Sequence, residues 1–237
     1  MKKIVVTGGT GRFAPYLKKI KTKHLIIFPK KKELDITKFN NIKKYLKKQK
    51  PLIVIHLAGL SRPMGLHEKN IQLSIKLNII GTSNLVRACA DQKIKLIYFS
   101  TQYVYPGTKG NYKETDSLLP PMNYGWSKLG GECAVQMYEN SLILRVCMTE
   151  KPFAHNRALC DAKTSFMYHE EVANILLKLL NKKGIINIGG KSQTIYDFAK
   201  KENPKIKKNY LKKIKKVFFP KDSSLNTAKL KNLIKKK

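Results

Sequence analysis

A tyrosine and a lysine four residues apart are the groups of this sequence best suited to acid–base chemistry. Tyr124 and Lys128 stand at the start of a helical pattern over residues 124–140, and positions i and i+4 of a helix share one face. A free phenol has a pKa of about 10, and a neighbouring ammonium group lowers it. The pair is therefore predicted to move a proton to or from a carbonyl or alcohol oxygen, with Lys128 also binding a ribose.

A hydroxyl group is expected next to this pair. Thr101 follows the apolar run at residues 95–99, and sites of parallel α/β sheets lie at the carboxyl ends of the strands. From there its hydroxyl can hydrogen-bond a substrate carbonyl and help stabilise a developing oxyanion. Thr101, Tyr124 and Lys128 are the predicted catalytic residues.

A glycine-rich turn follows the first apolar run of the chain. It reads TGGTGRFA over residues 7–14 and precedes a helical pattern at about 12–20. Gly8 is suited to the tight turn and Gly11 to a close approach of the backbone to a pyrophosphate, while Ala14 takes the place of a third glycine. The turn predicts a bound dinucleotide.

The elements that must position these residues alternate along the chain. Short apolar runs alternate with helical patterns through the first two thirds, which predicts a parallel sheet covered on both faces. We expect an α/β, Rossmann-type, doubly wound fold, with a cofactor-binding domain at 1–148 and a small, shortened substrate lobe at 149–237 that partly completes the sheet. The runs lie at 2–6, 24–28, 52–56, 95–99, 142–146 and 185–188, and the helical patterns at 12–20, 37–48, 68–90, 124–140, 170–180 and 194–200; residues 149–167 look irregular.

The net charge of +33 is large, but its composition argues against specific nucleic-acid binding. Only five of the 48 basic residues are arginine, the side chain that makes bidentate contacts to bases. A bias towards lysine, isoleucine and asparagine is typical of an AT-rich genome. No specific nucleic-acid partner is expected; a polyanion-binding protein driven by charge alone is the competing interpretation.

Several other features point to a cytoplasmic enzyme. The four cysteines are scattered, without a CxxC pair, so neither a metal site nor a disulfide framework is expected and a reducing compartment fits. The sequence has no apolar stretch of about 18 residues, so no membrane span is expected. No signal-peptide pattern is expected either.

Five segments together resemble the extended short-chain dehydrogenase/reductases, and among them most closely the dTDP-4-dehydrorhamnose reductases. They are the glycine turn, IHLAG at 55–59, NIIGTSNLVRAC at 78–89, FSTQYVYPGTKGNYKETD at 99–116 and NYGWSKLGGE at 123–132; DSSLNTAKL at 222–230 also looks like that family's C-terminal segment. The resemblance assigns the second residue of the Ser-Thr pair, Thr101, to catalysis. It also implies cofactor contacts at Gly11, Arg12, Phe13, Asp35, Ile36, Ala58, Gly59, Leu60 and Phe99, besides Gly8, Tyr124 and Lys128.

Two positions on the substrate side depart from the family pattern. Gln102 stands where the reductases usually carry aspartate, and Met148 where many carry a tryptophan that shapes the substrate site. Thr101, Gln102 and Met148 are the predicted substrate contacts. Dehydratases of the superfamily have an Asp-Glu pair after the catalytic threonine, and Gln102-Tyr103 supplies neither group, so dehydration is disfavoured.

The resemblance implies an NAD(P)H-dependent reductase of a nucleotide-linked 4-keto-6-deoxy sugar. The alternatives are a nucleotide-sugar 4-epimerase and a non-catalytic regulatory NADP-binding subunit, because the regulatory subunit of methionine adenosyltransferase resembles the same family. The segment after the second run, FPKKK at 28–32, has no acidic residue for the adenosine ribose. NADP is therefore expected, with Arg12 and Lys30 at its 2′-phosphate and NAD as the alternative. Helices 68–90 and 124–140 would pair in a homodimer, as in relatives.

Overall fold

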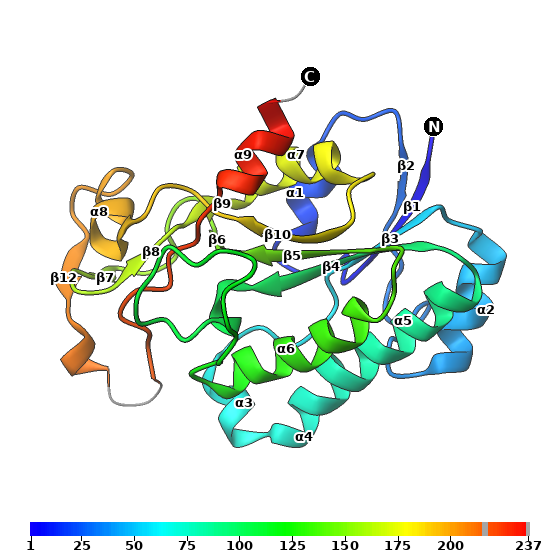
Figure 1. The fold of residues 1–237 in the computed structure, drawn as a ribbon, viewed down its shortest axis with the longest axis horizontal. Helices are drawn as coiled ribbons and strands as arrows, with labels where there is room; N and C mark the ends of the chain where they lie inside the picture. Colours follow the sequence, from blue (N-terminus) through cyan, green and yellow to red (C-terminus); the bar gives the residue numbers. More distant parts are fainter. Residues whose placement is uncertain (215–217, 236–237) are drawn as a thin grey trace.

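Six apolar segments form one parallel sheet at the centre of the molecule (Figure 1). The computed structural model describes residues 1–214 and 218–235. All five pairings between neighbouring strands are parallel, in the order β10-β5-β4-β3-β1-β2. This architecture confirms the predicted fold class. The strands are β1 Lys3–Thr7, β2 Leu25–Ile27, β3 Ile53–His56, β4 Lys95–Thr101, β5 Ser141–Val146 and β10 Gly184–Ile188.

Helices cover both faces of this sheet. One face packs against α1 (Ala14–Lys19), α7 (His169–Leu179) and α9 (Ala228–Lys235). The other packs against α2 (Phe39–Gln49), α5 (Gly81–Asp91) and α6 (Asn123–Gln136). Since both faces are buried, the central strands need apolar residues at successive positions, and this produces the continuous runs seen in the sequence.

The helix expected over residues 68–90 is interrupted once, at Asn70. α3 (Gly65–Lys69) precedes this residue, and α4 (Ile71–Ser74), the π-helical turn η1 (Ile75–Ile80) and α5 follow it as one continuous helical segment. Asn70 leaves the helical conformation, and its side chain accepts a hydrogen bond from the Leu73 backbone N–H. Asparagine competes in this way with the helical backbone, which explains the break.

The segments after residue 148 contribute to two parts of the structure. α7, β10 and α9 complete the main sheet and its cover, whereas most of the other segments form small two-stranded sheets, several of them around a separate apolar cluster. Residues 149–167, expected to be irregular, contain some of these short strands. The small elements are β6 Met148–Thr149, β7 Arg157–Leu159, β8 Lys163–Thr164, β9 Met167–Tyr168, β11 Gln193–Thr194, α8 Ile195–Lys200, β12 Lys207–Asn209 and η3 Leu211–Lys213.

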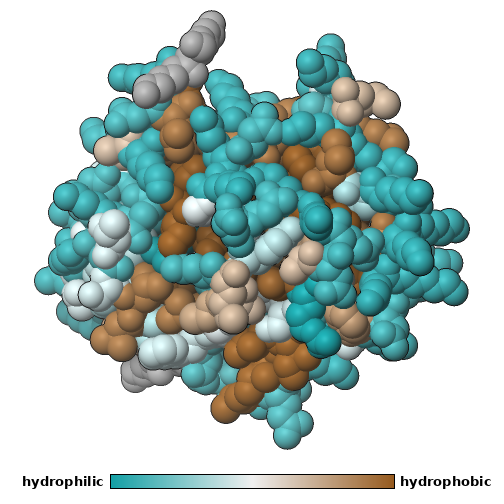
Figure 2. Space-filling view, turned by 45° about the vertical axis from the view of Figure 1, so that its right-hand side comes forward, coloured by the Kyte–Doolittle hydropathy of each residue, from teal (hydrophilic) through white to brown (hydrophobic). Residues whose placement is uncertain are grey.

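The face shown in Figure 2 is mainly hydrophilic, with several apolar areas between the polar side chains. Figure 2 shows hydrophobic side chains gathered at the lower edge of the molecule, at the level at which Figure 1 places α3 and α4. Ile71, Ile75, Ile80 and Trp126 are exposed on α4, η1 and α6. Within the described ranges, no helix has the length and apolar character needed to cross a membrane.

Candidate active site

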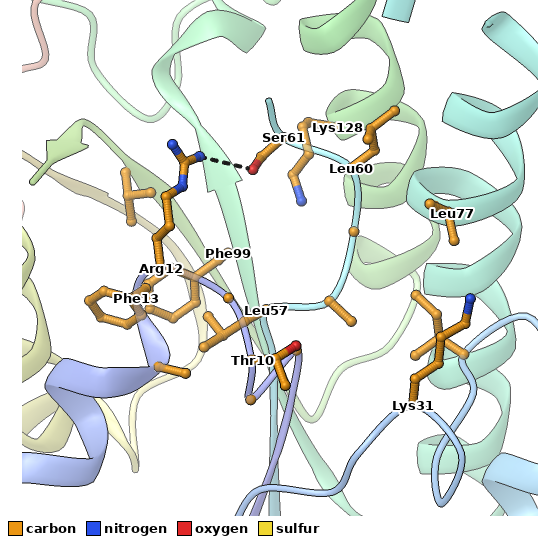
Figure 3. A pocket seen from close by; sticks show the side chains of 18 of the residues that line it. Thr10, Arg12, Phe13, Lys31, Leu57, Leu60, Ser61, Leu77, Phe99 and Lys128 are labelled. Atoms are coloured by element: carbon orange, nitrogen blue, oxygen red, sulfur yellow. Dashed lines mark hydrogen bonds between the residues drawn. The ribbon is translucent and has the colours of Figure 1, made fainter. Parts of the chain in front are cut away.

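A cavity of about 410 Å³ lies where the chain order of the sheet reverses, beyond the carboxyl ends of β1 and β3. This switch point is the usual ligand site of doubly wound sheets. Segments far apart in the sequence meet around it (Figure 3). All twelve residues predicted to contact a cofactor line it: Gly8, Gly11, Arg12, Phe13, Asp35, Ile36, Ala58, Gly59, Leu60, Phe99, Tyr124 and Lys128.

The glycine turn forms the floor of this cavity. Gly8 has a φ of +73°, and a Cβ there would lie 2.7 Å from the backbone nitrogen of Ala58. A side chain at this position would therefore drive the turn away from the loop that follows β3. The backbone N–H of Gly11 donates to the carbonyl oxygen of Gly8 at 2.9 Å, which closes the turn.

A buried asparagine stabilises the wall of the cavity opposite the glycine turn. Asn78 Oδ1 accepts from the Leu60 N–H at 2.7 Å, and its Nδ2 donates to the Leu60 carbonyl at 2.8 Å and to Ser127 Oγ at 2.8 Å. Asn78 thus ties the loop after β3 to α6. His56 is buried between the hydroxyls of Thr7 and Thr82.

Tyr124 and Lys128 face this cavity from the first two turns of α6. Burial raises the pKa of Tyr124, and hydrogen bonding to Thr101 and the charges of Arg62 and Arg12 act in the opposite direction. Burial also lowers the pKa of Lys128 to about 7, against the opposing charge of Glu132. The Lys128 ammonium lies 4.2 Å from the centre of the Tyr98 ring.

These directions differ from the expectation that Lys128 lowers the pKa of Tyr124. The desolvation of both groups disfavours their charged forms, the phenolate and the ammonium. The four-residue spacing predicts that the two side chains share one face of the helix, but it does not predict how far that face is shielded from water.

The lowered pKa of Lys128 has a measurable consequence. An amine reacts with an acylating reagent only when neutral, so we expect acetylation of Lys128 to rise with a midpoint near pH 7. An unperturbed lysine reaches its midpoint at about pH 10.4. Peptide mass spectrometry after brief exposure to acetic anhydride across a pH series measures this. A Lys128 midpoint near pH 10 would contradict the burial argument.

The three predicted substrate contacts lie in different environments. Thr101 and Gln102 are buried, and the Thr101 hydroxyl donates to Gln102 Oε1 at 3.2 Å. Neither residue is among those lining the two cavities described here, whereas Met148 lines the first.

Two arginines meet one carboxylate at the mouth of the first cavity. Glu150 Oε1 lies 3.0 Å from Arg12 Nη1 and 3.3 Å from Arg62 Nη1. Arg12 also donates to Ser61 Oγ at 3.4 Å (Figure 3). A second cavity of about 940 Å³ begins here, because Thr10, Gly11, Arg12 and Ser61 line both.

Arg12 and Lys30, expected to meet one 2′-phosphate, do not line the cavity together. Figure 3 shows Arg12 and Lys31 on opposite sides of the cavity, and Lys31 lines it whereas Lys30 does not. The turn that follows β2 presents only one lysine of the Lys-Lys-Lys run to the cavity. The sequence of the run does not indicate which one.

Sequence reasoning also missed His169 and Glu150. His169 begins α7, is 5% exposed, lines the cavity and packs edge-on against the rings of Phe13 and Tyr16. It approaches Glu150 because β6 and β9 pair in parallel. No motif marks these residues, since only the pairing of two very short strands brings them together.

A buried ion pair supports the site from behind. Glu132 of α6 and Arg145 of β5 are 0% and 1% exposed and are joined by two hydrogen bonds to one carboxylate oxygen. The second carboxylate oxygen accepts from Ser100 Oγ at 2.6 Å. This pair therefore connects the helix that carries Tyr124 to the strand that ends in Thr101.

Comparison with known proteins places this geometry in a family. The model of the family described as RmlD substrate binding domain matches residues 1–149. Methionine adenosyltransferase 2 subunit beta of Xenopus laevis is 39% identical over 107 residues, 44% of this chain and 31% of that protein. The dTDP-4-dehydrorhamnose reductase of Aggregatibacter actinomycetemcomitans is 28% identical over 161 residues, 66% of this chain and 54% of that protein. The matches thus span less than two thirds of these curated relatives.

Solved structures share the fold over nearly the whole chain. A crystal structure of dTDP-4-dehydrorhamnose reductase from Bacillus anthracis in complex with NADP superposes with a TM-score of 0.87 at 22% identity, over 98% of this chain and 91% of that one. On its sequence motifs, its fold and a family match over more than half its length, the chain belongs to the RmlD substrate binding domain family.

Proposed function

We propose that this protein is an NAD(P)H-dependent reductase of a nucleotide-linked 4-keto-6-deoxy sugar, for the biosynthesis of deoxysugars and polysaccharides. The observation that carries the proposal is the single cavity shared by the glycine turn, Tyr124 and Lys128. Family membership and relatives named dTDP-4-dehydrorhamnose reductase and dTDP-4-keto-6-deoxy-D-glucose reductase support it.

The proposed chemistry assigns one task to each catalytic residue. The reduced nicotinamide, when bound, supplies a hydride to the carbonyl carbon. Tyr124 donates its phenolic proton to the carbonyl oxygen, so the carbonyl becomes a secondary alcohol and the tyrosine becomes a phenolate. Thr101 stabilises the developing negative charge with its hydroxyl. Lys128 stabilises the phenolate when protonated and then passes it a proton.

The cavity fits a dinucleotide at several points. Gly8 lets the turn pack closely against the loop after β3, because a Cβ there would lie 2.7 Å from the Ala58 nitrogen, and Asp35 and Ile36 line the cavity together with Lys31. The Asp35 carboxylate accepts from the N–H and the hydroxyl of Thr37 at 3.0 and 2.8 Å. Both bonds go to Asp35 Oδ1. The ammonium group of Lys31, which lines the same cavity, favours a cofactor with a 2′-phosphate, which is NADP.

This preference is testable at Lys31. We expect Lys31→Ala to weaken NADPH binding about 10- to 100-fold and to leave NADH binding nearly unchanged, because a charge-assisted hydrogen bond is worth about 1.5–3 kcal/mol. Fluorescence titration with both nucleotides measures it. Lys30→Ala is the matched control, since Lys30 does not line the cavity. Equal losses for both nucleotides would refute a phosphate contact.

The second cavity is proposed to hold the sugar nucleotide. It is lined by Arg12 and Arg62 on one side and by residues of the 149–237 region, such as His155 and Arg157, on the other. The guanidinium groups of the three arginines favour a diphosphate. On this proposal the region after 148 serves as the substrate lobe, while α7 and β10 belong to the sheet.

One assay tests the reductase proposal directly. NADPH and NADH oxidation is followed by absorbance against a panel of nucleotide-linked 4-keto sugars. The expected result is one oxidised cofactor released for each alcohol formed; an epimerase would retain its cofactor instead. Tight cofactor binding without turnover on any substrate would refute the reductase.

A second candidate function is a non-catalytic subunit that binds NADP. The curated relatives that match at 37–39% identity are named methionine adenosyltransferase 2 subunit beta. The presence of Thr101, Tyr124 and Lys128 together favours the enzyme. Absence of turnover combined with stable binding to a methionine adenosyltransferase would favour the subunit.

A homodimer and a cytoplasmic location complete the proposal. The apolar side chains exposed on α4, η1 and α6 are suited to pairing with a second copy. All four cysteines are free thiols, which is compatible with a reducing compartment. Sedimentation analysis of wild type and Ile75→Lys tests the dimer, which should dissociate in the variant.

A further inference from the structure

A short helix outside both cavities contacts the start of the helix that carries Tyr124. α3 lies beside the first turn of α6 (Figure 1). Two consecutive residues of α3, His67 and Glu68, make the contacts. Neither lines the cavities described above, and the proposed mechanism uses neither.

Glu68 caps α6 from a distance of 55 residues. Its Oε1 accepts from the backbone N–H of Asn123 at 3.1 Å, and its Oε2 accepts from the Asn123 side-chain amide. The residue at the N-cap position of α6 is Met122, which offers no side-chain cap. A carboxylate there satisfies a free N–H and favours the positive end of the helix dipole. The residue after Asn123 is Tyr124.

His67 packs directly against the tyrosine ring. It is 0% exposed, and its ring centre lies 5.1 Å from that of Tyr124, with 59° between the planes. Its Nδ1 lies 2.7 Å from Ser74 Oγ, which fixes the orientation of the imidazole. Its Nε2 is buried and has no hydrogen-bond partner among the described residues.

Burial and two nearby charges determine the ionisation of this histidine. Burial lowers the pKa of His67, with Lys128 acting in the same direction and Glu68 opposing it. The imidazole ring is therefore neutral at pH 7 and above. It adds no positive charge beside the Tyr124 phenol in addition to that of Lys128. It acts on Tyr124 through contact.

We propose that His67 and Glu68 of α3 are positioning residues that hold Tyr124 in the orientation needed for proton transfer. The expected effect on kcat rests on the proposed function, whereas the expected effect on the orientation of Tyr124 does not. Glu68 fixes the start of α6, and His67 limits the rotation of the Tyr124 ring. Both act through Tyr124 without touching the reacting atoms.

The test uses His67→Ala, Glu68→Ala and the conservative Glu68→Gln, all as full chains. Because misplacement by about 1 Å costs on the order of 100-fold in rate, we expect the alanine variants to lower kcat about 10- to 100-fold, with KM for NADPH within about twofold. Glu68→Gln keeps an acceptor for the Asn123 N–H and should restore most of kcat. Glu171→Ala is the matched control, because Glu171 caps α7 in the same way by accepting from the Tyr168 N–H at 2.9 Å.

A second measurement needs neither substrate nor turnover. In protein labelled at tyrosine Cζ with ¹³C, the Tyr124 resonance is identified by its loss in Tyr124→Phe. We expect its titration midpoint to fall towards 10 in both alanine variants, as the phenol gains water, and to stay in place in Glu171→Ala. If no substrate is turned over but this midpoint falls, the reductase fails and the positioning proposal stands. If the midpoint stays, or if Glu171→Ala lowers kcat equally, the positioning proposal is overturned.

Discussion

Replacing Tyr124 by phenylalanine is expected to lower kcat for reduction of a nucleotide-linked 4-keto sugar by about 100- to 10,000-fold. This is the usual contribution of a positioned general acid. The substitution removes the only phenol among the residues that line the first cavity. Phenylalanine keeps the ring that packs against His67 and Tyr103, so the fold and the shape of the cavity should persist.

The effect should appear in the chemical step and not in cofactor binding. Stopped-flow measurement of NADPH oxidation in a single turnover gives the rate, and fluorescence titration gives the affinity, expected within a few-fold of wild type. Tyr196→Phe is the control, because Tyr196 of α8 lines neither described cavity. A variant that keeps more than a tenth of the wild-type rate would require another proton donor.

Breaking the buried pair between Glu132 and Arg145 is expected to destabilise the fold by about 3–5 kcal/mol. Glu132→Gln removes the negative charge and leaves the Arg145 guanidinium buried at 1% exposure. Tyr105 Oη, at 2.8 Å, and the Glu114 carbonyl, at 3.1 Å, still accept from it but carry no full charge. Urea denaturation at pH 7 measures the loss in free energy of unfolding.

Two further variants separate burial from charge pairing. Glu139→Gln removes the carboxylate of an exposed pair with Lys183, whose atoms are 3.1 Å apart, and should cost at most about 1 kcal/mol. The double replacement Glu132→Leu with Arg145→Met removes both charges and should be less destabilising than Glu132→Gln alone. Equal losses for Glu132→Gln and Glu139→Gln would show that the buried pair contributes no more than a surface pair.

The amino-acid sequence by itself determined the elements and most of the site. Continuous apolar runs predicted five strands of the sheet from the first two thirds of the chain and β10 from the remainder. The glycine turn and the YxxxK spacing are local patterns, so they could be located without knowing the fold. The resemblance then supplied Asp35, Ile36, Ala58, Gly59, Leu60 and Phe99, and every one of them lines the cavity.

Only the tertiary structure decided the environment of these residues. Burial of this face of α6 raises the pKa of Tyr124 and lowers the pKa of Lys128, whereas the sequence predicted that the lysine lowers the pKa of the phenol. Lys31 and not Lys30 lines the cavity, and Arg12 forms an ion pair with Glu150. His67 and Glu68 reach the start of α6 across more than fifty residues of sequence. Burial, charge pairing and capping between distant segments depend on which elements pack together, and neither local spacing nor composition carries that information.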